Sequence, residues 1–119
     1  MRLAYVTAAA LLAALVGCQQ HPPDALSPQT TPSGPHEVVI WDYHFYPTTT
    51  LTVPVGTEVT WVNRDIAPHT VTYRSYSEEA FDSGSMGHLV VFTHTFRKAG
   101  SYSYLCIFHQ GMQGTVVAE

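Results

Sequence analysis

Residue types that bind soft metal ions gather near the C-terminus. Cys106, His109 and Met112 offer a thiol, an imidazole and a thioether in the spacing C-x2-H-x2-M. A further imidazole, His69, comes just after the turn-forming segment 63–68. Thiolate, imidazole and thioether ligands select copper or zinc over magnesium or calcium. The spacing therefore predicts a metal site made by one loop and one upstream histidine.

Two imidazoles, one thiolate and a weak axial thioether are the ligand set of a blue-copper site. In this interpretation His69, Cys106 and His109 are the strong ligands and Met112 is the axial one. Met86 is an alternative axial ligand, and a structural zinc site stays open because Cys and His also bind zinc. A buried, purely structural thiol is the remaining alternative for Cys106.

The segment 36–119 must position these side chains. It is rich in Val, Thr, Tyr and Phe, and Gly and Pro interrupt its short apolar runs, which favours strands over helices. Alternating hydrophobicity predicts an all-β fold, a β-sandwich of seven short strands. These are expected near residues 37–41, 50–55, 58–63, 69–73, 90–97, 101–106 and 115–118.

The period of two along a strand indicates which side chains share a face. Val59, Trp61 and Asn63 should point inward together on one strand. Tyr102, Tyr104 and Cys106 should do the same on another, so Cys106 ends an inward-facing aromatic row. We expect its sulfur to lie at the end of a packed sandwich.

The N-terminal third has a different composition. Residues 1–17 combine an early Arg with an apolar run and are interpreted as a signal peptide, too short to span a bilayer. Residues 18–35 contain five of the chain's eight prolines and no aromatic residue, which predicts an extended tether. The folded domain is expected to span 36–119.

The charge argues against nucleic-acid binding, and the cysteine count argues against a disulfide-based fold. Residues 36–119 carry four basic and eight acidic side chains, so nucleic acid is not an expected partner. Cys18 and Cys106 are the only cysteines and allow at most one disulfide, but each has a more specific explanation.

Several short motifs together resemble the cupredoxin, or type 1 blue copper, family. They are the loop from Cys106 to Met112, Trp61-Val62-Asn63, Pro68-His69, Phe81-Asp82-Ser83-Gly84, Thr95-Phe96, Gly100-x-Tyr102-x-Tyr104 and Gly114-Thr115-Val116-Val117. The resemblance covers 36–119, and the short loop is most similar to that of amicyanin, with plastocyanin and pseudoazurin next.

This resemblance implies a Greek-key β-sandwich of seven to eight strands that holds one copper ion cycling between Cu(II) and Cu(I). The implied function is single-electron transfer by a monomer, without enzymatic activity, to and from redox partners such as a cytochrome, an oxidase or a dehydrogenase. An alternative is copper delivery or storage at the cell envelope.

A second resemblance concerns Leu15-Val16-Gly17-Cys18, which is similar to the lipobox of bacterial lipoproteins. It implies that Cys18 carries lipid and that the mature protein is anchored to a membrane on its periplasmic or extracytoplasmic side. Gln19 is not the Asp that retains many lipoproteins at an inner membrane, so an outer membrane is slightly favoured where there is one.

Two residues depart from the amicyanin and plastocyanin pattern. Phe108 stands where proline is usual before the second histidine, and Thr70 stands where asparagine usually braces the ligand loop. We hypothesise that the N–H groups of Phe108 and Thr70 both donate to the Cys106 sulfur. Asn63, Thr70 and Phe108 are therefore expected to surround the ligands.

Overall fold

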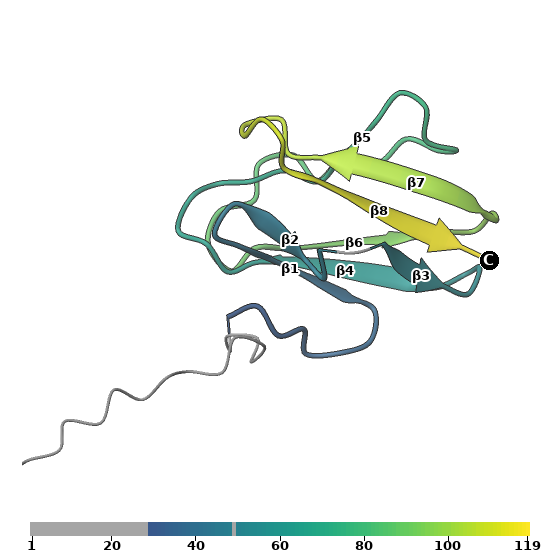
Figure 1. The fold of residues 1–119 in the computed structure, drawn as a ribbon, viewed down its shortest axis with the longest axis horizontal. Helices are drawn as coiled ribbons and strands as arrows, with labels where there is room; N and C mark the ends of the chain where they lie inside the picture. The colour runs from purple at the N-terminus through teal and green to yellow at the C-terminus, as the bar shows by residue number, and fades with distance from the viewer. Residues whose placement is uncertain (1–28, 49) are drawn as a thin grey trace, which may run out of the picture.

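Eight short strands form two four-stranded sheets that pack face to face (Figure 1). The computed structural model describes residues 29–48 and 50–119. The strands are β1 (Glu37–Trp41), β2 (His44–Tyr46), β3 (Leu51–Val53), β4 (Glu58–Asn63), β5 (Thr72–Tyr73), β6 (Val91–Thr95), β7 (Gly100–Leu105) and β8 (Gln113–Ala118).

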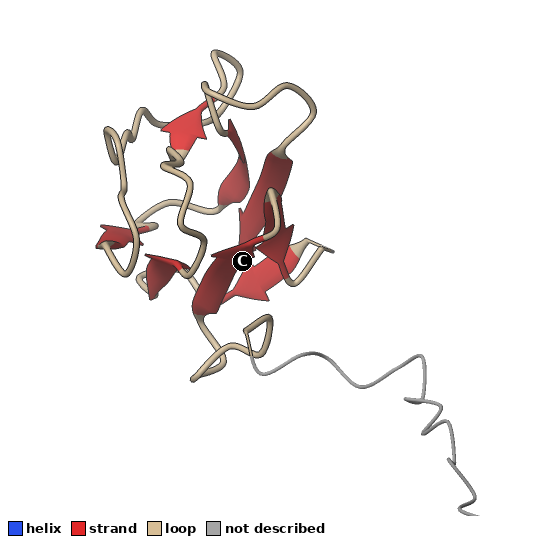
Figure 2. Cartoon of the chain, turned by 90° about the vertical axis from the view of Figure 1, so that its left-hand side faces the viewer, coloured by secondary structure: helices blue, strands red, loops and turns tan. Residues whose placement is uncertain are grey.

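One sheet has the strand order β2-β1-β4-β6 and the other has β3-β8-β7-β5. The pairs β1–β4 and β3–β8 are parallel, and the remaining neighbours are antiparallel. Figure 2 shows strands and loops throughout the described part of the chain. No helix within residues 29–48 and 50–119 is long and apolar enough to cross a membrane.

The core between the sheets is built around Trp61, whose side chain is fully buried. Its ring meets that of Tyr104 edge to face at a centroid distance of 5.5 Å, and the rings of Phe81, Phe92 and Phe96 lie within 6.3 Å. Such aromatic pairs contribute more than their buried area alone. The expected inward row of Tyr102, Tyr104 and Cys106 is confirmed, because all three are buried.

The all-β sandwich is confirmed, with differences at two strands. The three-residue strand β2 was not predicted, because a run of His-Phe-Tyr is too short for alternation to reveal. The strand expected over 69–73 is wrong in its first half. Only Thr72–Tyr73 belongs to a strand, and His69 instead forms an isolated bridge with Met86.

Residues 29–35, the last part of the expected tether, contact the domain. The Arg64 guanidinium donates to the Thr31 carbonyl at 2.9 Å, the Ser33 hydroxyl at 3.2 Å and the Glu37 carboxylate at 3.0 Å, and Thr30 is buried. This segment runs back beneath β1 in Figure 1. The expected signal peptide, the Cys18 lipidation site and residues 18–28 of the tether lie outside the described residues.

Candidate metal centre

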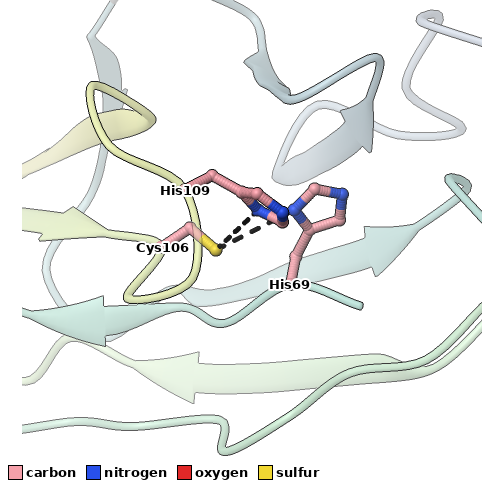
Figure 3. Close-up of side chains that lie close together, drawn as sticks. All are labelled: His69, Cys106 and His109. Atoms are coloured by element: carbon pink, nitrogen blue, oxygen red, sulfur yellow. Dashed lines mark hydrogen bonds between the residues drawn. The ribbon is translucent and has the colours of Figure 1, made fainter. Parts of the chain in front are cut away.

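His69, Cys106 and His109 converge at one end of the sandwich. The Cys106 sulfur lies 3.8 Å from His69 Nδ1 and 3.4 Å from His109 Nδ1, and the three ligand atoms lie within 4.8 Å of one another. Figure 3 shows both imidazoles pointing toward the sulfur. His69 and Cys106 are buried and His109 is half-buried. One ion can therefore contact all three atoms.

Each ligand comes from a different structural setting. Cys106 directly follows β7, and His109 lies in the loop that joins β7 to β8. His69 precedes β5 and is held by two backbone hydrogen bonds with Met86, of 2.7 and 3.1 Å. Strands β5, β7 and β8 belong to the same sheet, so that sheet and the backbone pairing of His69 with Met86 hold the ligands in position.

Asp65 orients the ring of His69 and is a residue that sequence reasoning missed. Its carboxylate lies 2.8 Å from His69 Nε2, which leaves Nδ1 directed at Cys106. The same carboxylate accepts the N–H groups of Asp42 at 2.9 Å and Tyr43 at 3.0 Å. A carboxylate behind a ligating histidine fixes its tautomer and raises its basicity. The only sequence signal is the spacing of four residues between Asp65 and His69.

Thr70 braces the ligand loop twice. Its N–H donates to the Cys106 sulfur at 3.3 Å, as predicted, and its hydroxyl accepts the Ile107 N–H at 2.9 Å. The threonine hydroxyl thus braces the ligand loop at the position where asparagine usually does so. Thr72 donates to that hydroxyl at 2.9 Å and completes the chain of contacts.

Asn63 ties two loops together beneath His69. Its amide nitrogen lies 2.9 Å from the carbonyls of both Ala67 and Met86, and its amide oxygen accepts the Asp65 N–H at 2.9 Å. The side chain is fully buried. Asn63 therefore supports the site without facing the ligand atoms, which agrees with its predicted place around them.

The second donor that we expected for the cysteine sulfur is absent. Among the hydrogen bonds of residues 29–48 and 50–119, the Phe108 N–H makes none to Cys106, so Thr70 is the one backbone donor. These hydrogen bonds therefore support the part of the hypothesis that concerns Thr70 and not the part that concerns Phe108. Its ring is instead about half exposed, at 49%, beside His109. Phe108 therefore contributes to the surface around the site.

Two methionines lie near the ligands. Met112 is buried at the end of the loop, where its carbonyl accepts the Cys106 N–H at 3.0 Å and its N–H donates to the His109 carbonyl at 3.3 Å. Met86 is also buried, and its backbone pairs with that of His69. Met112 closes the ligand loop through its backbone, and its role as axial ligand remains a prediction.

Tyr43 covers both imidazoles. Its ring stands edge to face with His109 at a centroid distance of 4.8 Å and with His69 at 5.6 Å. Asp42 and Tyr43 both have positive φ, and the Asp65 carboxylate holds their N–H groups in this turn. No sequence pattern singles out Tyr43, because an unusual backbone conformation brings it here.

Burial lowers the pKa of His69, although the hydrogen bond and the negative charge of Asp65 act in the opposite direction. Burial alone would raise the pKa of Asp65, but the N–H groups of Tyr43 and Asp42, together with His69, bring that pKa below its ordinary value. A neutral His69 keeps its Nδ1 lone pair available to a metal ion.

These two shifts predict how the stability of the metal-free chain depends on pH. Between the folded and unfolded pKa values the unfolded chain binds more protons, so acid favours unfolding. The free energy of unfolding should fall as the pH drops below the ordinary His value of 6.5, and Asp65 should add to this fall below 3.8. Urea unfolding at pH 7.5, 6 and 5 measures the effect. His69→Gln should flatten the first part of the curve, and a curve parallel to that of the parent would contradict the assignment.

Comparisons with known proteins agree with this geometry. The cupredoxin-like domain matches residues 7–118. Amicyanin from Paracoccus denitrificans is 40% identical over 76 residues, which are 62% of this chain and 58% of the relative. The match therefore spans less than two thirds of that protein's length.

Solved structures extend the likeness to three dimensions. An oxidized amicyanin mutant has a TM-score of 0.63 and 36% identity, with 70% of this chain and 80% of that chain covered. A copper-containing nitrite reductase from Thermus scotoductus SA-01 has a TM-score of 0.66 and 29% identity over 82% of this chain, but only 25% of its own length is covered. The resemblance inferred from the sequence motifs is confirmed, and the chain belongs to the cupredoxin-like family.

Proposed function

We propose that this protein transfers single electrons through one type 1 copper ion held by His69, Cys106, His109 and, at longer range, Met112. The observation that carries the proposal is the convergence of one sulfur and two Nδ1 atoms within 4.8 Å at the end of the sandwich. A thiolate with two imidazoles suits copper, and the buried, hydrogen-bonded setting of the sulfur suits a redox-active ion. Copper, when bound, supplies the one-electron change between Cu(II) and Cu(I).

The chain's own residues keep the ligand positions nearly constant through such a change. Asp65 fixes the His69 ring, and Thr70 links the His69 segment to the ligand loop through two hydrogen bonds. The Thr70 N–H also withdraws charge from the sulfur and so favours the reduced ion. Because these contacts hold the ligand atoms in place, little rearrangement would be needed when the oxidation state changes.

The experiment that tests this proposal is the optical spectrum and redox cycle of the full chain after Cu(II) is added. An intense visible band from thiolate-to-copper charge transfer, reversible over repeated one-electron cycles with retained copper, is expected. A colourless protein that takes zinc equally well would contradict the proposal. Loss of the ion at each reduction would instead favour copper delivery or storage.

We infer that the protein is an electron carrier and not an enzyme. With His69, Cys106 and His109 as close ligands and Met112 as a fourth, the site would leave no open position for a substrate. The nitrite reductase that shares the fold is covered over only 25% of its length, so the likeness concerns a small part of that enzyme. The amicyanin relatives favour a carrier.

The electron would enter and leave through His109, which is half-buried, at a surface that includes Ile66 and Phe108, 90% and 49% exposed. A small docking area at this surface would suit short-lived redox complexes, for example with a cytochrome, an oxidase or a dehydrogenase. We propose an extracytoplasmic location for a monomer anchored through lipid on Cys18, with an outer membrane slightly favoured. Metabolic labelling with palmitate, lost in Cys18→Ala, tests the anchor.

Asp65→Asn should raise the reduction potential. The carboxylate behind His69 stabilises the doubly charged ion more than the singly charged one, and loss of such a partner lowers metal affinity about 10- to 100-fold. When only Cu(II) affinity falls, the potential rises by about 60–120 mV at roughly 59 mV per tenfold change. Voltammetry measures this shift. Asp82→Asn removes an equal charge from an exposed carboxylate bound to Thr72 and Gly84 and is the matched control; equal shifts would contradict a specific role of Asp65.

A further inference from the structure

Arg74 is held in a fixed position beside the ligand loop. It directly follows β5, and its backbone N–H donates to the Ser103 carbonyl at 2.9 Å. Its guanidinium donates to the Gln113 side chain at 2.6 Å and lies 5.5 Å from the centre of the Tyr76 ring. A guanidinium fixed in this way loses little freedom when it binds a further group.

Two hollows flank the Arg74–Gln113 contact. One, of about 220 Å³, is lined by Arg74 together with Cys106, His109 and Met112 of the metal centre. The other, of about 300 Å³, is lined by Arg74 and by the hydroxyl-bearing residues Thr48, Thr50, Ser103 and Thr115. Arg74 therefore borders the same depression as His109, and the second hollow beside it offers hydrogen-bonding groups.

The charge of Arg74 is not neutralised within the described part of the chain. None of the ion pairs found among residues 29–48 and 50–119 includes it. The acidic residues of its own loop are engaged elsewhere: Glu79 pairs with His94, Asp82 accepts hydrogen bonds from Thr72 and Gly84, and the Glu78 side chain lies against Gly100. An anion that approaches the depression meets a positive group without a competing carboxylate.

The remaining cations lie elsewhere. Arg64 is already paired with Glu37, and Arg97 and Lys98 precede Gly100, at the end of β7 opposite to Cys106. In residues 36–119, whose net charge is negative, Arg74 is the cation that borders the metal centre. Its position gives this depression a charged, directional contact beside the ligand loop.

We propose that Arg74 recognises a carboxylate on the redox partner, so that the partner docks at His109 through an acidic side chain placed in the depression between Arg74 and the ligand loop. This inference rests on the proposed function and names the chemistry of the partner's surface. Arg binds carboxylates through two parallel hydrogen bonds, which fixes orientation as well as position. The Gln113 contact presents the guanidinium for this purpose.

The test uses two small redox reagents of opposite charge with the copper-loaded full chain at low ionic strength. Arg74→Gln should slow reduction by hexacyanoferrate(II), followed by bleaching of the visible band, roughly three- to tenfold, since charge at a site steers oppositely charged reactants. Reduction by hexaammineruthenium(II) should not slow. Lys98→Gln makes the same charge change at the far end and should leave both rates within about 1.5-fold of the parent.

A binding measurement separates docking from electron transfer. The redox-inert anion hexacyanocobaltate(III), added to the reduced protein, should shift the amide NMR signals of Ser103, Gln113 and Gly114, and Arg74→Gln should abolish these shifts. Equal slowing in Arg74→Gln and Lys98→Gln, or amide shifts that survive loss of Arg74, would overturn the proposal. A parent protein without a visible band would count against the copper function and not against anion recognition, which the NMR titration tests alone.

Discussion

Cys106→Ser should abolish the visible absorption of the copper-loaded protein and its reversible redox wave. The intense band of a thiolate–copper site arises from charge transfer out of sulfur, and a hydroxyl cannot replace that donor. The side chain is 3% exposed and accepts the Thr70 N–H, so serine fits the space. Copper titration followed by absorption, with circular dichroism to confirm folding, measures the effect. A folded variant that keeps the band would exclude Cys106 as a ligand.

Two methionine variants serve as controls for this loss. Met112→Leu should keep an intense visible band, because an axial thioether contributes weakly, and should raise the potential by removing a donor to Cu(II). Met86→Leu is nearly isosteric and should leave the potential unchanged, since we expect Met86 to contribute backbone hydrogen bonds only. A shift in Met86→Leu together with none in Met112→Leu would reverse the axial assignment.

Gly114→Ala should destabilise the domain by about 1–3 kcal/mol, the usual cost of overpacking a core. Gly114 pairs with Tyr104 across β7 and β8, and a Cβ atom on it would lie 2.4 Å from the Tyr104 ring and hydroxyl. That ring is buried against Trp61 and Phe45, so it has no space into which to turn. Thermal unfolding of the metal-free chain should show a loss of about 4–8 °C for each kcal/mol.

Gly87→Ala is the matched control for this variant. A Cβ atom there meets nothing within 4 Å, and its φ is not positive. Its stability should stay within about 0.5 kcal/mol of the parent. A similar loss in both variants would show that glycine is replaced poorly for general backbone reasons and not because of Tyr104. Since Tyr104 precedes Cys106 by two residues, Gly114→Ala should also broaden the visible band.

The ligands that are close in sequence were predictable from the sequence. Cys106, His109 and Met112 occupy one loop, so their spacing alone brings them near each other, and the inward row of β7 placed Cys106 at a strand end. His69 was predictable because the loop supplies only one imidazole, and a histidine just after a turn could supply the second. Its distance from Cys106, however, depends on the pairing of β5 with β7, which short alternating runs do not determine.

The residues that support the ligands were harder to predict from the sequence. Asp65 acts through three contacts, and two of them are to backbone N–H groups of a turn 22 and 23 residues away. Tyr43 reaches the histidines because it adopts a positive φ, which its residue type disfavours. For Thr70 only the hydrogen bond from its backbone N–H was predicted. The bond to its side chain was not, because threonine has a hydroxyl where asparagine has an amide. Contacts of this kind depend on tertiary packing, and local propensity does not report them.

The attachment of residues 29–35 to Arg64 decides where a force on the N-terminus acts. Arg64 follows β4 at the end of the sandwich that carries Asn63 and Asp65, and its guanidinium lies 3.4 Å from the Gln29 carbonyl. A membrane attachment upstream of residue 29 would therefore pull on the half of the domain that holds the ligands. Because the same guanidinium also binds Glu37 at the start of β1, this pull would be shared between β1 and the segment that follows β4.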